Sequence, residues 1–222
     1  LSVPLFNTVE ENAIIKNLNF REDINLSLNT GSSNYCIIAN TNNGFIENIS
    51  FNNLNVKVSN LTNENVVFLS IVCNINNGNI NNINFDSVTA IDSRENVTAS
   101  ISRFNGVTCT NNGIIDNVFG TLNLKNYVKV SGVTESLLQE IKNIDLTLNI
   151  STPNKFIGAG LAYSTLGESK IEVSNVNLNI NLSGNNNINN FGGVFKSLNN
   201  SCELNNISVN FNLGNYYPEN NL

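Results

Sequence analysis

The chain contains no histidine and no methionine. Without histidine, neither a Ser-His-Asp nor a Cys-His catalytic arrangement can form, and the common zinc-ligand patterns are excluded. Without methionine the sequence has no initiator, so we expect it to be a segment or a processed product of a longer protein. The lack of a signal peptide therefore says nothing about secretion.

Charged residues are scarce, at 13% of the chain, and acidic residues outnumber basic ones. The formal net charge is −6, and the 11 Lys and Arg residues are scattered without a run. A nucleic-acid surface requires clustered cations, so we expect no nucleic-acid partner. No apolar stretch approaches the ~18–20 residues of a membrane span, which predicts no membrane span in this segment.

The four cysteines, at positions 36, 73, 109 and 202, include no C-x-x-C pair. Aligning the turns that follow them places Ala39, Cys73 and Cys109 in one column of stacked strands. Stacked strands lie ~4.7–4.9 Å apart, within the ~4.4–6.8 Å Cα separation that a disulfide allows. We favour stacked, buried free thiols at Cys73 and Cys109 over a disulfide, because cysteine is commonly buried and alanine shares the column.

Asparagine is the abundant residue, at 52 of 222 positions. Such a bias is typical of disordered, aggregation-prone tracts. Here, however, the asparagines alternate with Val, Ile, Leu and Phe at period two, which indicates β-strands.

A six-residue frame, apolar-x-Asn-apolar-x-apolar, recurs along the whole chain, as in Ile46–Phe51. The other copies are Ile15–Phe20, Ile80–Phe85, Ile141–Leu146, Val173–Leu178, Leu204–Val209 and the degraded copy Ile115–Gly120. Their central asparagines, at 17, 48, 82, 117, 143, 175 and 206, are 31, 34, 35, 26, 32 and 31 residues apart. A repeat of roughly thirty residues is typical of a solenoid, and its continuity predicts one domain over residues 1–222.

The central asparagine of the frame predicts a bend. In an unbroken strand Ile46 and Ile49 would face opposite sides, and both can face a core only if the chain bends at Asn48. Asparagine is the non-glycine residue best suited to the left-handed region, and its amide can both donate and accept. We therefore predict a structural asparagine ladder of Asn17, Asn48, Asn82, Asn117, Asn143, Asn175 and Asn206.

These features predict an all-β fold: a right-handed parallel β-helix of about seven turns, each of roughly 31 residues with three strands. The left-handed form is disfavoured because a strict six-residue apolar repeat is absent. Three Asn-Asn-Gly turns, at 42–44, 76–78 and 111–113, suggest a repeated tight turn with positive φ. Residues 134–140 fit either one helical turn or a strand. Because a solenoid exposes its terminal edges, we expect further chain or another subunit to cover the N-terminal end.

The segment Pro4–Phe20 resembles the start of the β-helical N-terminal region of bacterial immunoglobulin A metallopeptidases. Phe191–Phe195, followed by Leu204–Ile207, resembles the GLUG-type repeats of large bacterial surface proteins. The resemblance implies a right-handed β-helix on a secreted or surface-attached protein. It does not extend to peptidase activity, which requires an H-E-x-x-H zinc site that a chain without histidine cannot form.

The best candidate for chemistry is the outward column of the repeat: Lys16, Glu47, Asn81, Asp116, Lys142, Ser174 and Asn205. Glu47 and Asp116 lie two turns apart, roughly 10 Å by strand spacing. That separation slightly exceeds the ~6.5–9.5 Å of an inverting glycosidase pair. A solvated face with occasional charges is therefore the favoured interpretation. Calcium-binding repeats use aspartate-rich turns, and the neutral Asn-Asn-Gly turns predict no metal or other cofactor.

Three functions remain open. The chain is expected to be a non-catalytic structural or adhesive module of an extracellular or cell-surface protein, contacting host or neighbouring-cell surface molecules or glycans. The first alternative is a polysaccharide-degrading β-helix enzyme that uses Glu47, Asp116 and Lys142. The second alternative is the subunit of an extracellular filament that self-associates through exposed turn ends.

Overall fold

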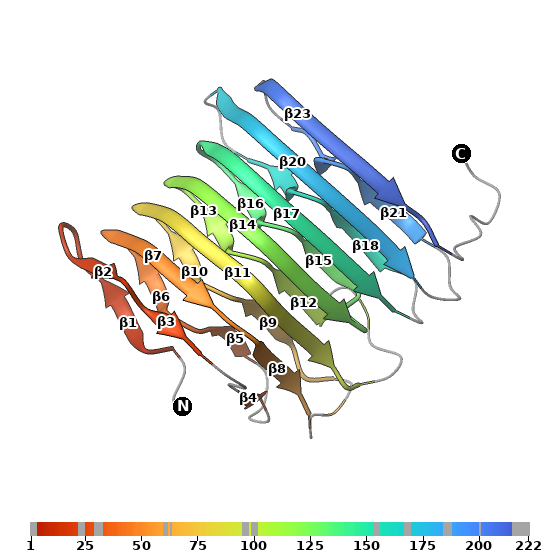
Figure 1. Cartoon of the computed structure of the whole chain (residues 1–222), viewed down its shortest axis with the longest axis horizontal. Helices are drawn as coiled ribbons and strands as arrows, with labels where there is room; N and C mark the ends of the chain where they lie inside the picture. The colour runs from red at the N-terminus through yellow and green to blue at the C-terminus, as the bar shows by residue number, and fades with distance from the viewer. Residues whose placement is uncertain are drawn as a thin grey trace.

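The computed structural model describes residues 4–21, 25–28, 33–59, 62, 64–94, 98, 102–152, 156–166, 170–183, 188–199 and 201–214. Within these residues the protein is all-β, contains no helix, and forms a parallel β-solenoid, as predicted. Figure 1 shows the turns following one another from the red N-terminal end of the stack to the blue C-terminal end. No helix in the described ranges could cross a membrane.

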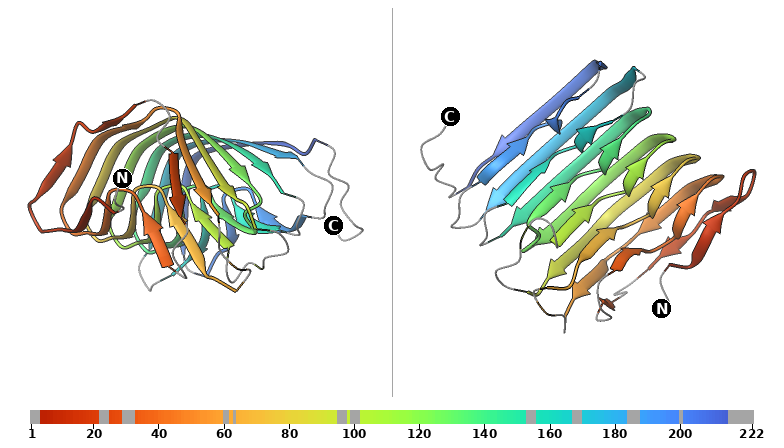
Figure 2. Two further views of the ribbon diagram at one scale, coloured as in Figure 1. Left: turned by 90° about the horizontal axis from the view of Figure 1, so that it is seen from below. Right: turned by 180° about the vertical axis from the view of Figure 1, so that it is seen from behind.

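Three parallel sheets run the length of the stack, one for each predicted strand of a turn (Figure 2). Sheet A consists of β1 (Phe6–Val9), β6 (Ala39–Asn42), β10 (Cys73–Asn76), β13 (Thr108–Asn111), β16 (Thr134–Leu137), β19 (Ala162–Thr165) and β22 (Phe195–Ser197). Sheet C consists of β5 (Ser33–Cys36), β9 (Val67–Ser70), β12 (Ser102–Asn105), β15 (Lys129–Ser131), β18 (Phe156–Ala159) and β21 (Ile188–Gly192).

Sheet B contains the longest strands and carries the repeated frame. Its main path is β2 (Ile14–Lys16), β7 (Phe45–Phe51), β11 (Asn79–Asp92), β14 (Ile114–Lys125), β17 (Ile141–Ser151), β20 (Ile171–Ser183) and β23 (Cys202–Asn212). The short strands β3 (Asn19–Phe20), β4 (Asn25–Leu28) and β8 (Leu54–Val58) lie beside this path. In the part of the chain that the structure describes, sheets A and B hold seven strands along the stack and sheet C holds six, so complete turns are fewer than the predicted seven.

The six-residue frame packs as its residue pattern predicts. Ile46 pairs in register with Ile15 and Ile80, so equivalent residues of successive turns stack directly. Ile46 and Ile49 are 0% and 1% exposed, which confirms that both face the core. Burying such a side chain contributes roughly 1.5–3 kcal/mol, and the five inner turns, from Ile46 to Val173, repeat this contribution.

A column of phenylalanines runs through the first three turns of the core. The ring centroids of Phe20 and Phe51 are 4.9 Å apart, and those of Phe51 and Phe85 are 5.7 Å apart. The next residue in the column is Gly120, which accounts for the degraded copy of the frame. Gly120 has a φ of +121°, and a Cβ there would lie 2.0 Å from the Phe85 carbonyl oxygen. Only glycine fits this conformation and this close approach, and the register of the two strands shifts just beyond it, between Phe85 and Val88.

The segment with two possible structures, residues 134–140, contains strand β16 and no helix. Thr134 pairs with Thr108 on one side and with Ala162 on the other, so this segment continues sheet A through the shortest repeat. Sheet pairing, which satisfies the backbone polar groups of every turn, therefore outweighs the local helix signal.

Candidate functional site

The predicted asparagine ladder lies along the outer surface of sheet B. All seven of its residues have φ between 53° and 60°, which confirms the left-handed bend. The Asn48 amide nitrogen donates to Asn17 Oδ1 at 3.2 Å, and that of Asn82 donates to Asn48 Oδ1 at 2.7 Å. Asn117 donates in turn to Asn82 Oδ1 at 3.1 Å. The ladder therefore ties each bend to the preceding one through solvent-facing amides.

The ladder changes partner at one step. Asn143 donates to Asp116 Oδ1 at 2.8 Å instead of to Asn117, after the 26-residue repeat. The original pattern resumes where Asn175 donates to Asn143 at 2.9 Å and Asn206 donates to Asn175 at 3.0 Å. The ladder is continuous in position, and one of its hydrogen bonds runs to a carboxylate.

A second ladder, which the sequence pattern did not predict, lies inside the molecule at the Asn-Asn-Gly turns. Asn42, Asn76 and Asn111 are 0%, 0% and 0% exposed. Asn42 donates to Asn76 Oδ1 at 2.8 Å, and Asn76 donates to Asn111 Oδ1 at 2.8 Å. The signal in the sequence was the identical first residue of the three turns. Its partners could be assigned only once the register was known.

The reason for the Asn-Asn-Gly spelling differs from the one predicted. None of the residues of these three turns has a positive φ, so that expectation was wrong. The first asparagine is needed for the buried ladder. The glycine is needed because successive turns approach closely: a Cβ on Gly78 would lie 2.1 Å from the Gly44 carbonyl oxygen, and one on Gly113 would lie 2.0 Å from that of Gly78.

The predicted cysteine column is wrong by one residue. Cys73 pairs with Ala39, as expected, but its partner on the other side is Thr108, not Cys109. All four cysteines are free thiols. Cys73 is fully buried in the core, and its Sγ lies 3.6 Å from Thr108 Oγ1. Cys109 alternates to the outer side of sheet A and is half-buried. A Cys73–Cys109 disulfide would therefore have to join side chains on opposite faces of the sheet.

The column proposed for chemistry exists as predicted. Lys16, Glu47, Asn81, Asp116, Lys142, Ser174 and Asn205 pair in this order along sheet B. Glu47, Asp116 and Lys142 line one hollow of about 330 Å³, together with the apolar side chains of Phe45 and Ile114. The Lys142 ammonium lies 2.8 Å from Glu140 and 3.9 Å from Asp116. A hydrogen bond to Glu140 raises the pKa of Lys142, so this amine stays protonated at neutral pH.

A second group of charges, which the sequence analysis missed, lies where sheets C and A meet. Glu135 of β16 accepts from Arg103 at 2.6 Å and from Lys129 at 2.7 Å, all through Oε1. The Lys129 ammonium also lies 3.5 Å from the centre of the Tyr163 ring, and Arg103 lies 4.1 Å from that of Phe68. Burial lowers the pKa of Lys129, and its hydrogen bond to Glu135 opposes that shift. These residues come from consecutive turns, so no local motif marks them.

In the described part of the chain, no three His, Cys, Asp or Glu side chains are grouped so that they could hold a metal ion. No family model, no curated protein and no solved structure matches the chain.

Proposed function

We propose that the chain is a non-catalytic structural or adhesive module of a secreted or cell-surface protein. The observation that carries the proposal is the continuity of its lateral bonding. The outer ladder links every turn from Asn17 to Asn206, and the strands of sheets A and B pair from the first described turn to the last. A solenoid bonded in this way resists bending and presents long, regular faces, which suits a spacer or a binding surface.

The charges in the Glu47 hollow support a non-catalytic role. Asn81 separates Glu47 from Asp116, and two strand spacings of about 4.8 Å put these carboxylates roughly 10 Å apart. Lys142, with its raised pKa and its contact with Glu140, is poorly suited to act as a base. The proposed extracellular location rests on the sequence resemblance to the GLUG-type repeats of bacterial surface proteins.

Incubation with a panel of acidic and neutral polysaccharides, followed by measurement of new reducing ends and of unsaturated products, tests the proposal. We expect no turnover with the purified chain. Turnover that Glu47→Gln abolishes would establish the polysaccharide-degrading alternative. Lys16→Gln, a change in the same column outside the hollow, is the matched control.

A filament subunit is the second candidate, and exposed apolar side chains at both ends of the stack favour it. In the first turn Phe6, which pairs with the buried Ala39, is 44% exposed, and in the last turn Leu204 and Phe211 are 45% and 41% exposed. Leu204 and Phe211 continue the core columns of Val173 and Ile180, so a turn of another solenoid could stack on them. Light scattering that grows with concentration and is abolished by Phe211→Lys would support assembly; a monomer at all concentrations would rule it out.

A further inference from the structure

The outer side of the corner between sheets C and A holds a hollow in its N-terminal half, and the columns of outward side chains that line it continue along the axis of the stack. We call this whole corner the corner groove. Small, buried side chains occupy the corner itself: Cys36, Ser70, Asn105, Ser131 and Ala159 pair in this order along sheet C. Asn74 spans the corner, since its amide nitrogen lies 2.8 Å from Asn40 Oδ1 in sheet A and 3.5 Å from the Asn34 carbonyl in sheet C.

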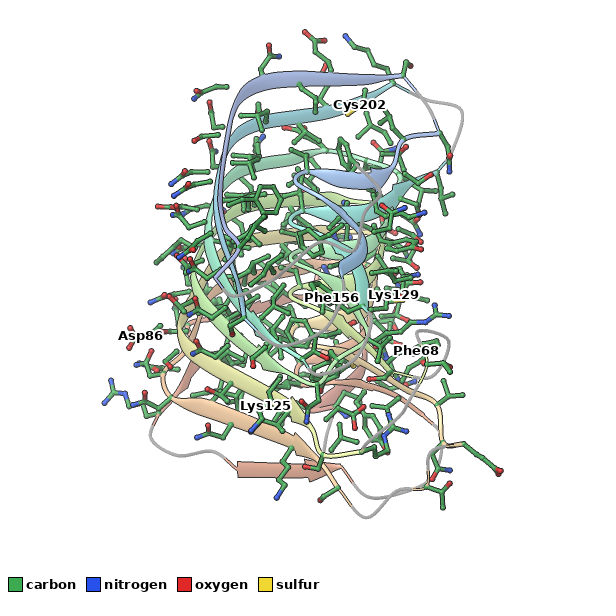
Figure 3. The ribbon with its side chains drawn as sticks, turned by 90° about the vertical axis from the view of Figure 1, so that its right-hand side faces the viewer. Phe68, Asp86, Lys125, Lys129, Phe156 and Cys202 are labelled. Carbon is green, nitrogen blue, oxygen red and sulfur yellow. The ribbon has the colours of Figure 1, made fainter. Side chains whose placement is uncertain are left out.

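Two columns of outward side chains form the walls of this corner groove. The sheet A wall runs Asn7, Asn40, Asn74, Cys109, Glu135, Tyr163 and Lys196. The sheet C wall runs Asn34, Phe68, Arg103, Lys129, Ile157 and Asn190. The N-terminal half includes a hollow of about 540 Å³, lined by residues such as Asn34, Asn40 and Asn74. Figure 3 shows Phe68 and Lys129 on the same side of the molecule, opposite Asp86.

Polar atoms without a hydrogen-bond partner gather along this groove. In the described residues, the buried side-chain atoms of this kind are Asn74 Oδ1, Ser131 Oγ, Glu135 Oε2 and Tyr127 Oη, and the first three belong to the groove. Asn74, Ser131 and Glu135 are 8%, 0% and 8% exposed. A buried polar atom left unpaired is costly, so its repeated occurrence in one groove calls for a partner. Two of the three atoms can only accept, so that partner must donate hydrogen bonds, as hydroxyl groups do.

The groove also differs in charge from the rest of the chain. Its two wall columns carry three cations, Arg103, Lys129 and Lys196, and one carboxylate, Glu135, whereas the whole chain has a net charge of −6. Arg103 and Lys129 already contact Glu135, and Lys196 lies 5.6 Å from the centre of the Tyr163 ring. A ligand that fits must therefore offer hydroxyl donors for the acceptors and negative charge for the cations.

We propose that the corner groove binds an acidic polysaccharide, a linear chain of hydroxyl-rich sugars bearing carboxylates. Its hydroxyls donate to Asn74 Oδ1 and Glu135 Oε2 after small side-chain rotations, and its carboxylates lie beside Lys196 and Arg103. The planar side chains of Asn40, Asn74 and Tyr163 provide flat surfaces and amides for successive sugar rings. This inference rests on the adhesive form of the proposed function and names its ligand.

Calorimetric titration of the full chain with hexagalacturonate, and with cellohexaose as a neutral probe, tests the groove. We expect hexagalacturonate to bind more tightly, with an affinity that falls as salt is raised. Lys196→Ala should weaken binding about fivefold, as the loss of one contacting charge does at a partly exposed site. Lys125→Ala, which removes the same charge from an exposed position of β14 on sheet B, away from the groove and from the Glu47 hollow, is the matched control and should leave the affinity unchanged.

The outcomes separate the groove from the broader proposal. Binding weakened by Lys142→Ala, a change in the Glu47 hollow, and not by Lys196→Ala would overturn the groove and leave an adhesive module. Equal binding of polyglutamate would overturn the assignment to carbohydrate, and no binding of hexagalacturonate at millimolar concentration would overturn the inference altogether. If the protein cleaved hexagalacturonate and Lys196→Ala still weakened its binding, the non-catalytic function would be overturned and the groove would be preserved.

Discussion

Asn76 and Asn77 are neighbours in one turn, yet their amides donate in opposite directions: Asn76 belongs to the buried ladder, and Asn77 belongs to a separate, exposed row of Asn43, Asn77 and Asn112. Asn76 is fully buried and donates to Asn111 in the following turn at 2.8 Å. Asn77 is exposed and donates to Asn43 in the preceding turn, also at 2.8 Å. The two hydrogen bonds have equal lengths, but Asn76 is buried and also donates to the Ile114 carbonyl at 3.3 Å, so its amide should contribute more to stability.

Replacing each of these asparagines by alanine should therefore give very different results. Asn76→Ala leaves Asn42 and Asn111 with lost partners in a dry interior, and we expect a loss of about 2–4 kcal/mol in the free energy of unfolding. In Asn77→Ala, water can replace the lost hydrogen bonds to Asn43 and Asn112, so the change should cost less than about 1 kcal/mol. Urea denaturation of both variants measures the difference. Equal losses would mean that the buried ladder is not formed as described.

The bend at Asn82 can be divided into conformation and hydrogen bonding. Asn82 has a φ of 54°, donates to Asn48 and accepts from Asn117. Asn82→Gly keeps the left-handed conformation accessible and removes only the ladder bonds, whereas Asn82→Ala also adds backbone strain of about 1–2 kcal/mol. We expect Asn82→Ala to be less stable than Asn82→Gly in thermal unfolding by about 1 kcal/mol after the entropy of glycine is included. An alanine variant at least as stable as the glycine variant would contradict the bend.

A buried ion pair fixes the loop side of the stack. Asp92 is 0% exposed and accepts from Arg94 Nε at 2.9 Å and from Ser102 Oγ at 2.7 Å. Arg94 reaches further to the backbone carbonyls of Thr62 and Asn65. Asp92→Asn leaves the guanidinium without its counter-charge and should cost about 3–5 kcal/mol in chemical denaturation. Asp86→Asn, at an exposed position of the same strand β11, should be close to neutral; similar losses in both would refute a special role for the pair.

The cysteines should react slowly with thiol reagents at neutral pH. Burial raises the pKa of Cys36 and of Cys73 to about 12 and that of Cys109 to about 11. Because the thiolate is the reactive form, alkylation followed by mass spectrometry at pH 8 should modify half-buried Cys202 and Cys109 before Cys73. Rapid modification of Cys73 in the native protein would contradict its place in the core.

The same shifts make stability depend on pH. Thiols of the unfolded chain titrate near 8.5, well below those of the folded chain. The native state therefore holds its protons more tightly, and its free energy of unfolding should fall as pH rises from about 9 toward about 12. Cys73→Ser should reduce this slope in denaturation series recorded at several pH values. A slope unchanged by that substitution would assign the effect to other groups.

Much of the fold could be predicted because the same six-residue frame occurs seven times along the chain. The spacing of the central asparagines, the two inward apolar residues around each of them and the bend itself all follow from local chemistry, as Ile46, Asn48 and Ile49 illustrate. The errors arose where register decides. The sequence alignment was shifted by one residue and placed Cys109, instead of Thr108, beside Cys73. The same uncertainty in register hid the column that runs from Asn74 through Cys109 to Glu135.

The groove could not be predicted for a further physical reason. Arg103, Lys129 and Glu135 meet through the corner between two sheets, and the depth of that corner depends on packing that no local pattern records. Glu135 lies in a segment whose sequence fits either a helical turn or a strand. Its neighbours are therefore evident only once the structure shows strand β16 and its pairing.

The stacking of the turns can be measured directly between two exposed residues at opposite ends of one column. Lys16 and Asn205 are six pairings apart along sheet B, so stacked strands about 4.8 Å apart place them roughly 29 Å from each other. Cysteines introduced at these two positions, in a chain with Cys109 and Cys202 replaced by serine, can carry spin labels. Pulsed electron paramagnetic resonance should then give a narrow distance distribution near 30 Å. A broad distribution, or one centred well away from that value, would contradict the continuous parallel stack.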